Sequence, residues 1–106
     1  GDELIFDQKI IKEGLSVAIL NASGVEGEAK IVSRIVANMG GEVRMLANRE
    51  EQAESEIVVA EERWRESDSV KKISQALKIN KIRIGQVTDG RAGIAIIIAK
   101  DYTQVY

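Results

Sequence analysis

The segment that most constrains the fold joins an apolar run to a glycine-containing turn and then to a stretch with helical periodicity. Ser16–Leu20 is almost continuously apolar and is followed by turn residues at Asn21–Gly24, which predicts a strand buried on both faces. From Val25 onward the apolar residues recur at helical spacing, and Gly40-Gly41 ends the stretch as a left-handed helix terminus requires. This stretch therefore predicts a strand, a tight turn and an amphipathic helix.

The rest of the chain repeats this kind of pattern. The further predicted strands are Glu42–Ala47, Glu56–Ala60, Lys81–Val87 and Gly93–Ala99. A second helix is expected to begin near Ser67 or Asp68, because either side chain can cap the free N–H groups of a first turn. Ile82 and Ile84 are expected to point inward, and Asp89-Gly90 is typical of a hairpin turn before the last strand.

The predicted order is β-α-β-β-α-β-β, an α/β two-layer sandwich in which two helices cover one face of a mixed sheet. Two β-α-β units joined by a loop favour a ferredoxin-like arrangement, or split β-α-β. The two halves echo each other at an offset of 41 residues, as Val17 with Val58 and Val32 with Ile73, which suggests a duplication. The last strand is too apolar for a sheet edge, so it either inserts into the sheet or is covered by another chain or by the N-terminal lead-in.

The length of 106 residues indicates one domain. We expect residues 1–14 to form a lead-in or linker, residues 15–102 the domain and residues 103–106 a tail. Gly1 stands where a natural chain would have Met and is interpreted as a tag remnant. The lead-in carries two apolar clusters, Leu4–Phe6 and Ile10-Ile11, which are expected to pack on the edge of the domain.

Composition excludes several classes of function. The net charge of −2 gives no support to binding of nucleic acid or of an anionic membrane. The chain has no His and no Cys, which removes the common nucleophile–base pairs and the nitrogen and sulfur metal ligands. The carboxylates are scattered and are typical of a solvated acidic surface. We therefore predict no catalytic residues, no metal and no cofactor, and hence no enzyme.

The turn after the first strand offers candidate contacts to a ligand or partner: Asn21, Ser23, Gly24 and Gly27. Free N–H groups at the start of a helix can hold an anion, but Glu26 and Glu28 would repel phosphate. In the alternative interpretation the polar side chains bond the turn backbone while the glycines supply unusual dihedrals. The same residues spell the GXXG of nucleic-acid-binding KH domains, although there the loop joins two helices and is usually basic.

Trp64 is the second candidate contact and is flanked by Arg63 and Arg65. A Trp just before a helix commonly packs as a staple on its first turn. A Trp between two arginines in a polar loop could instead stack on a sugar ring. Both interpretations remain open at this point.

Residues Val17–Ala29 resemble the signature of the LytR-type C-terminal domain, a small module of LytR-CpsA-Psr cell-envelope proteins. The pattern of that family is an apolar strand, then Asn-Gly-Ser/Thr-Gly-x-x-Gly-Leu-Ala, then a helix. The matching residues are Asn21, Ser23, Gly24, Gly27 and Ala29. Ala22 replaces the usual Gly, and Glu28 replaces the usual Leu. Residues 99–102, Ala-Lys-Asp-Tyr, resemble the family's Gly-Lys-Asp-Tyr, so the resemblance spans about residues 15–102.

The resemblance implies a bacterial, extracytoplasmic accessory domain, because the catalytic residues of LytR-CpsA-Psr enzymes lie in another domain. It implies binding of cell-wall glycopolymer or of an envelope protein, and a parent protein tethered through an upstream membrane helix. The alternative is a domain for protein interaction or self-association with no glycan ligand. Such a domain would use the last strand or the Leu4–Ile11 lead-in, and a homodimer through an edge strand is one form of it.

Overall fold

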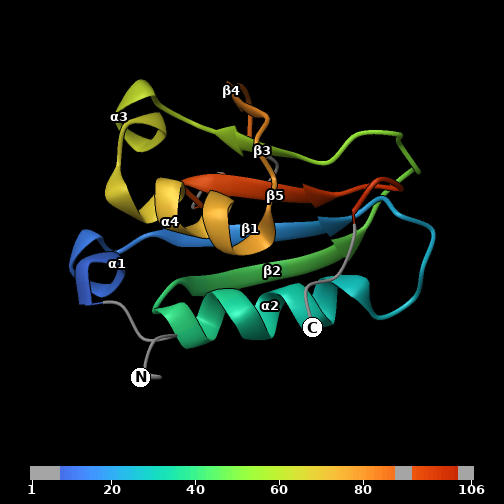
Figure 1. The fold of residues 1–106 in the computed structure, drawn as a ribbon, viewed down its shortest axis with the longest axis horizontal. Coiled ribbons are helices and arrows are strands. Elements are labelled where there is room, and N and C mark those ends of the chain that lie inside the picture. The colour runs from blue at the N-terminus through green and yellow to red at the C-terminus, as the bar shows by residue number, and fades with distance from the viewer. Residues whose placement is uncertain (1–7, 88–91, 103–106) are drawn as a thin grey trace.

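The computed structural model describes residues 8–87 and 92–102. Its helices are α1 (Gln8–Glu13), α2 (Glu28–Met39), α3 (Glu62–Arg65) and α4 (Asp68–Leu77). Its strands are β1 (Ser16–Asn21), β2 (Glu42–Asn48), β3 (Glu56–Val59), β4 (Ile82–Ile84) and β5 (Ile94–Ile98). The five strands form one sheet in the order β2-β1-β5-β3-β4 (Figure 1).

The predicted mixed sheet is confirmed, but its strand order differs from the ferredoxin-like, split arrangement. β1 pairs in parallel with both β2 and β5, whereas β3 pairs in parallel with β4 and antiparallel with β5. Each β-α-β unit therefore keeps its two strands as direct neighbours. β5 lies between the two units and joins them into one sheet.

The insertion of β5 accounts for its composition. All five residues of β5 are buried, and a strand with neighbours on both sides and cover on both faces requires this. Of the three arrangements left open by the sequence, insertion into the sheet is correct. The expected hairpin before this strand is wrong, because β3 separates β4 from β5. Asp89 and Gly90 lie outside the described residues.

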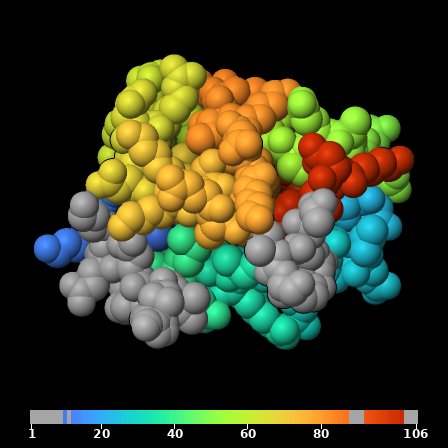
Figure 2. Space-filling view, viewed as in Figure 1, coloured from blue at the N-terminus to red at the C-terminus, as the bar shows by residue number. Residues whose placement is uncertain are grey.

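Both long helices cover the same face of the sheet, as predicted. Val32 and Val36 of α2 and Val70 and Ile73 of α4 are completely buried and belong to one apolar cluster with residues of β1, β3 and β5. The space-filling view from this side shows residues of α2 and α4 at the front of the molecule (Figure 2). Because successive side chains of a strand point to opposite faces of the sheet, every second side chain lies on the other face.

That opposite face carries a smaller apolar cluster. Leu20 of β1, Val58 of β3 and Ile97 of β5 are buried there. Val87 and Ala92, which lie between β4 and β5 in the chain, pack against them. Val87 and Ala92 thus contribute to the core on the face opposite α2 and α4.

The ends of the helices agree in part with the sequence. Ser67 caps α4 by accepting a hydrogen bond from the N–H of Val70 at 3.2 Å, and Gly40 ends α2 in the left-handed conformation. The start of α2 at Val25 is wrong, because Gly27 has a φ of 91° and the helix begins only at Glu28. Val25 is consequently 54% exposed. A left-handed backbone here is incompatible with an earlier helical turn.

The fourth strand also differs from expectation. It is limited to Ile82–Ile84, and Ile84 is 45% exposed although the sequence placed it inside. Within residues 8–87 and 92–102, β4 ends the sheet and one side of it has no neighbouring strand, so Ile84 is less covered than a residue of an inner strand. A short edge strand of this kind is common in natural sheets.

Part of the lead-in belongs to the packed structure. Ile10 of α1 is completely buried in the main core, and Glu13 accepts hydrogen bonds from the N–H and the Oγ of Ser69 at the start of α4. Leu4–Phe6 lies outside the described residues. None of the described helices is long and apolar enough to cross a membrane.

Candidate functional site

The candidate site lies where the three parallel strands β2, β1 and β5 end. Ligands of α/β sheets bind most often at the carboxyl ends of parallel strands, because the loops that follow the strands meet there. In this chain those loops are residues 22–27, 49–55 and 99–102, which lie together at the right of Figure 1. Two of these loops carry the motifs that resemble a known family.

The turn after β1 is held by its own side chains. The amide nitrogen of Asn21 donates to the carbonyl of Val25 at 2.8 Å, and its amide oxygen accepts from the N–H and the Oγ of Ser23 at 3.1 and 2.6 Å. The Oγ of Ser23 in turn accepts from the N–H of Val25 at 3.0 Å. Both polar side chains of the motif are therefore used inside the turn. This is the backbone-bonding role that the sequence offered as the alternative to ligand binding.

The first glycine of the motif brings the turn close to the loop after β2. Gly24 has a φ of 79°, and a Cβ at this position would lie 2.6 Å from the carboxylate of Glu51. Glu51 itself forms an ion pair with Lys100 at 3.0 Å. Gly24 of the segment 17–29 and Lys100 of the segment 99–102 therefore both lie next to the carboxylate of Glu51.

Backbone hydrogen bonds connect the same three loops. Gln52 donates its N–H to the carbonyl of Ala22 at 3.0 Å, and Lys100 donates its N–H to the carbonyl of Gln52 at 3.1 Å. Ser55 donates both its N–H and its Oγ to one carboxylate oxygen of Asp101, at 2.9 and 2.7 Å. The two motifs are therefore far apart in the chain but belong to one hydrogen-bonded assembly.

A shallow hollow of about 260 Å³ opens beside this assembly, between the start of α2 and the end of β2. It is lined by Asn21, Glu26, Gly27, Ala29, Lys30, Leu46, Ala47 and Asn48. Its charged groups are one carboxylate and one ammonium, so its net charge is balanced. The side chains of Lys30 and Asn48 are exposed, which leaves donor and acceptor groups available to a ligand.

Glu28, where the family usually has Leu, begins α2 and is only 8% exposed. Its Oε1 has no hydrogen-bond partner among the described residues. A carboxylate in the first turn of a helix is favoured by the helix dipole. A buried oxygen without a hydrogen-bond partner costs free energy, however. No contact among the described residues explains why this chain has Glu28 where the family usually has Leu.

Trp64 lies at the other end of the molecule. It is 8% exposed and belongs to the main core, where a Cβ on Gly93 would come 2.9 Å from its indole nitrogen. The guanidinium of Arg63 lies 4.7 Å from the centre of the ring. Gly93 bonds to Ser16 at the start of β1, so Trp64 and the turn after Asn21 are about 17 Å apart along that strand. The structure does not bring the two sets of candidate residues together, and it leaves little of the indole ring open to a sugar.

The arginines that flank Trp64 are engaged locally. Arg63 pairs with Glu61 at 2.6 Å, and Arg65 pairs with Glu62 at 3.0 Å. All four side chains are largely exposed. These are surface ion pairs near α3, with small expected contributions to stability.

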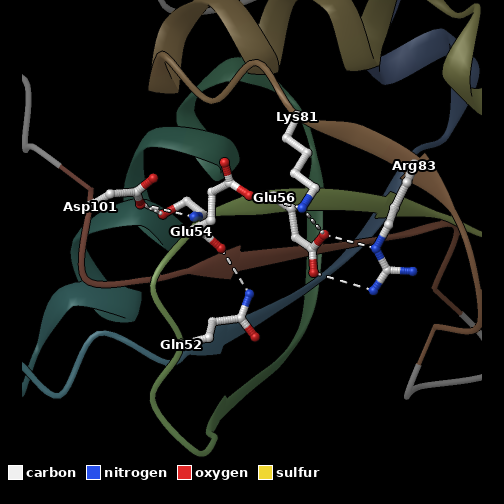
Figure 3. A network of polar contacts seen from close by, with 7 residues as sticks. Gln52, Glu54, Glu56, Lys81, Arg83 and Asp101 are labelled. Atoms are coloured by element: carbon white, nitrogen blue, oxygen red, sulfur yellow. Dashed lines mark hydrogen bonds and ion pairs between the residues drawn. The ribbon is translucent and has the colours of Figure 1, made fainter.

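A third polar cluster ties β3 to the edge strand β4 (Figure 3). The carboxylate of Glu56 accepts two hydrogen bonds from the guanidinium of Arg83, at 2.8 and 3.2 Å. This contact holds the pKa of Glu56 below its usual range, although burial opposes the shift. Lys81 pairs with Glu54 at 2.9 Å, which raises the pKa of Lys81. Because the charges are paired with one another, the cluster is a structural clamp on β4.

The residues that build the hollow were only partly found from the sequence. Asn21 and Gly27 are among the candidate contacts named from the sequence, whereas Lys30, Leu46 and Asn48 are not. Only the parallel pairing of β1 with β2 brings these three residues beside the turn. The described residues contain no group of three or more acidic side chains that could hold a metal ion.

Comparison with known proteins gives one family. The family described as LytR cell envelope-related transcriptional attenuator matches residues 14–102. The curated proteins contain no match.

Two solved structures share the fold. The solution structure of the C-terminal domain of RV0431 is 17% identical and has a TM-score of 0.56, over 80% of this chain and 71% of that one. The crystal structure of the soluble domain of a conserved hypothetical secreted protein from Mycobacterium marinum, an Rv2700 ortholog, is 13% identical with a TM-score of 0.56. That match covers 94% of this chain and 67% of the other.

Proposed function

Because the chain belongs to the family of the LytR cell envelope-related transcriptional attenuator, we propose that it is a non-catalytic accessory domain that binds cell-wall glycopolymer outside the cytoplasmic membrane. The location is further supported by the similarity in fold to the soluble domain of a secreted protein. A parent protein with an upstream membrane helix would hold the domain at the envelope.

The position of the hollow is the observation that carries this proposal. The hollow is built partly by Asn21, Gly27 and Ala29, which are residues of the stretch that resembles the family. The same stretch is bonded to the loop after β2 through the carbonyl of Ala22 and lies close to that loop at Gly24. The segment that resembles the family therefore forms one wall of the hollow.

The chemistry of the hollow fits a neutral, hydroxyl-rich ligand. Glu26 accepts hydrogen bonds, Lys30 donates them and the amide of Asn48 does both. The acidic side chain disfavours a phosphate, and Leu46 gives an apolar wall for the ring carbons of a sugar. A volume of about 260 Å³ lies just below the range of roughly 300–1,000 Å³ found for pockets that enclose drug-sized ligands, which suits a short stretch of glycan at the surface.

Binding to purified, insoluble peptidoglycan tests the proposal. The wild-type domain should be retained, whereas Asn48→Ala and Lys30→Ala should each reduce the bound fraction. Lys71→Ala is the matched control, because Lys71 is also an exposed helical lysine but does not line the hollow. The proposal fails if the wild type is not retained, or if the control variant loses as much binding as Lys30→Ala.

A further inference from the structure

The outer edge of β2 is the feature that carries an inference beyond ligand binding. Among the described residues β2 pairs only with β1, so it forms one end of the sheet. Free sheet edges attract other strands, and natural proteins protect them with charges, proline or bulges. The two halves of β2 differ in this respect.

The first half of β2 is protected. The pairing with β1 shifts register between Val17 and Ala18, which leaves Arg44 as an extra residue in β2. Arg44 also forms an ion pair with Glu42 at 3.5 Å. A bulge and two charges together make this half a poor partner for another strand.

The second half of β2 lacks these protections. Met45, Leu46, Ala47 and Asn48 are uncharged, contain no proline and follow the bulge. Leu46 is 47% exposed, and it is one of three large apolar side chains exposed among the described residues. An uncharged edge with an exposed leucine is what a sheet-to-sheet contact requires.

The direction of the backbone groups also suits such a contact. Glu42 and Arg49 both donate their N–H groups inward, to Leu15 and Asn21, each at 2.9 Å. In a regular strand, two residues whose N–H groups point to the same side are an even number of positions apart. Glu42 and Arg49 are seven positions apart, so the alternation is interrupted once, at the bulge. Because Arg49 points inward and successive residues alternate, the N–H and C=O groups of Asn48 and Leu46 point outward, away from β1.

We propose that two copies of this chain associate through β2, in an antiparallel pairing centred on Leu46. Leu46 of one copy then lies opposite Leu46 of the other, and each donates its N–H to the carbonyl of its equivalent. Met45 lies opposite Ala47, and Arg44 lies opposite Asn48. This register places no like charges opposite each other and covers both exposed leucines.

The other end of the sheet does not offer an equivalent self-pairing. β4 has only three residues, and full antiparallel overlap of two copies would place Arg83 opposite Arg83. Arg83 is already bonded to Glu56. The self-complementary edge is therefore β2, although Ile84 on β4 is as exposed as Leu46.

Sedimentation equilibrium without glycan, from micromolar to millimolar protein, tests the proposal. The wild type should show a concentration-dependent dimer, and Leu46→Lys should weaken dimerisation by about tenfold or more, because two lysines would face each other at the axis. Ile84→Lys is the control with matched exposure and should dimerise like the wild type. Circular dichroism confirms that both variants are folded.

Amide hydrogen exchange gives a second readout. At high protein concentration the exchange of the Leu46 and Asn48 amides should slow, while that of Ile84 should not change. A wild type that stays monomeric throughout overturns the proposal, as does a Leu46→Lys variant that dimerises normally or an Ile84→Lys variant that does not. A protein that captures a foreign extended peptide at β2 without dimerising overturns it as well. Leu46 and Asn48 also line the hollow, so this dimer would compete with a glycan there. Sedimentation without glycan measures the dimer alone, and its failure would leave the glycan proposal standing.

Discussion

Ser55 and Asp101 join the start of β3 to the loop after β5 through two hydrogen bonds to a single carboxylate oxygen. The Oγ of Ser55 also accepts from the N–H of Ala99 at 2.8 Å. Asp101 belongs to the second motif of the family resemblance, so its role in this chain is to fasten the inserted strand. The polar residues of both motifs hold loops in place.

Replacing Asp101 with Ala should lower the free energy of unfolding by about 1–2 kcal/mol, because two donors on Ser55 lose a charged acceptor. Asp101→Asn should cost less, since an amide oxygen can still accept. Urea unfolding measures both values. Glu66→Gln, at an exposed position, is the control, and a loss in Asp101→Ala no larger than in this control would contradict the assigned role.

Asn21→Asp should destabilise the domain more than Asn21→Ala, although it is the smaller change in shape. A carboxylate cannot donate to the carbonyl of Val25 and would place a negative charge beside it. We expect a loss of about 1–3 kcal/mol, because Asn21 is buried. Thermal unfolding of the two variants compares them directly, and equal stabilities would show that the negative charge beside the carbonyl of Val25 is unimportant.

Arg83→Gln should lower stability at neutral pH by about 1 kcal/mol or less, since the Arg83 side chain is half exposed. Arg83 lowers the pKa of Glu56, so its contribution is fully present above the pKa of an unfolded glutamate, about 4.3. The contribution is lost as the pH falls from there through the lowered pKa of the folded protein.

Urea unfolding at pH 7 and near pH 3 should therefore show a difference between wild type and Arg83→Gln that is smaller in acid. Arg65→Gln, which removes a pair of two exposed side chains, should show almost no difference at either pH. A difference for Arg83→Gln that is independent of pH would exclude the ion pair as its cause.

Glu28→Leu should stabilise the protein by about 1 kcal/mol, because it removes a buried carboxylate oxygen without a partner among the described residues. Loss of the favourable helix-dipole interaction would offset part of this gain. Glu26→Leu, at an exposed position just before the helix, should not stabilise. A lower melting temperature for Glu28→Leu would indicate that the carboxylate has a required partner.

The sequence predicted those features that depend on local pattern. The apolar runs around Val17 and Val58, the Ser67 cap and the end of α2 at Gly40 all follow from burial, hydrogen bonding or backbone conformation within a few residues. Both helices share one face because each presents a single apolar stripe.

Features that depend on distant pairing were missed. The apolar character of β5 indicated burial but could not indicate which two strands would enclose it. Ile84 alternates as an inward residue would, yet it is exposed because β4 ends the sheet. Leu46 and Asn48 could not be joined to the turn after Asn21 until β2 was placed beside β1.

The most direct test of glycan binding is a nuclear magnetic resonance titration of the ¹⁵N-labelled domain with soluble, purified peptidoglycan fragments. The amide signals of Lys30, Leu46 and Asn48 should shift in a saturable way, and those of Arg63, Trp64 and Arg65 should stay unchanged. Saturable shifts around Trp64 with none at the hollow would contradict the account, and so would the absence of any shift at millimolar glycan.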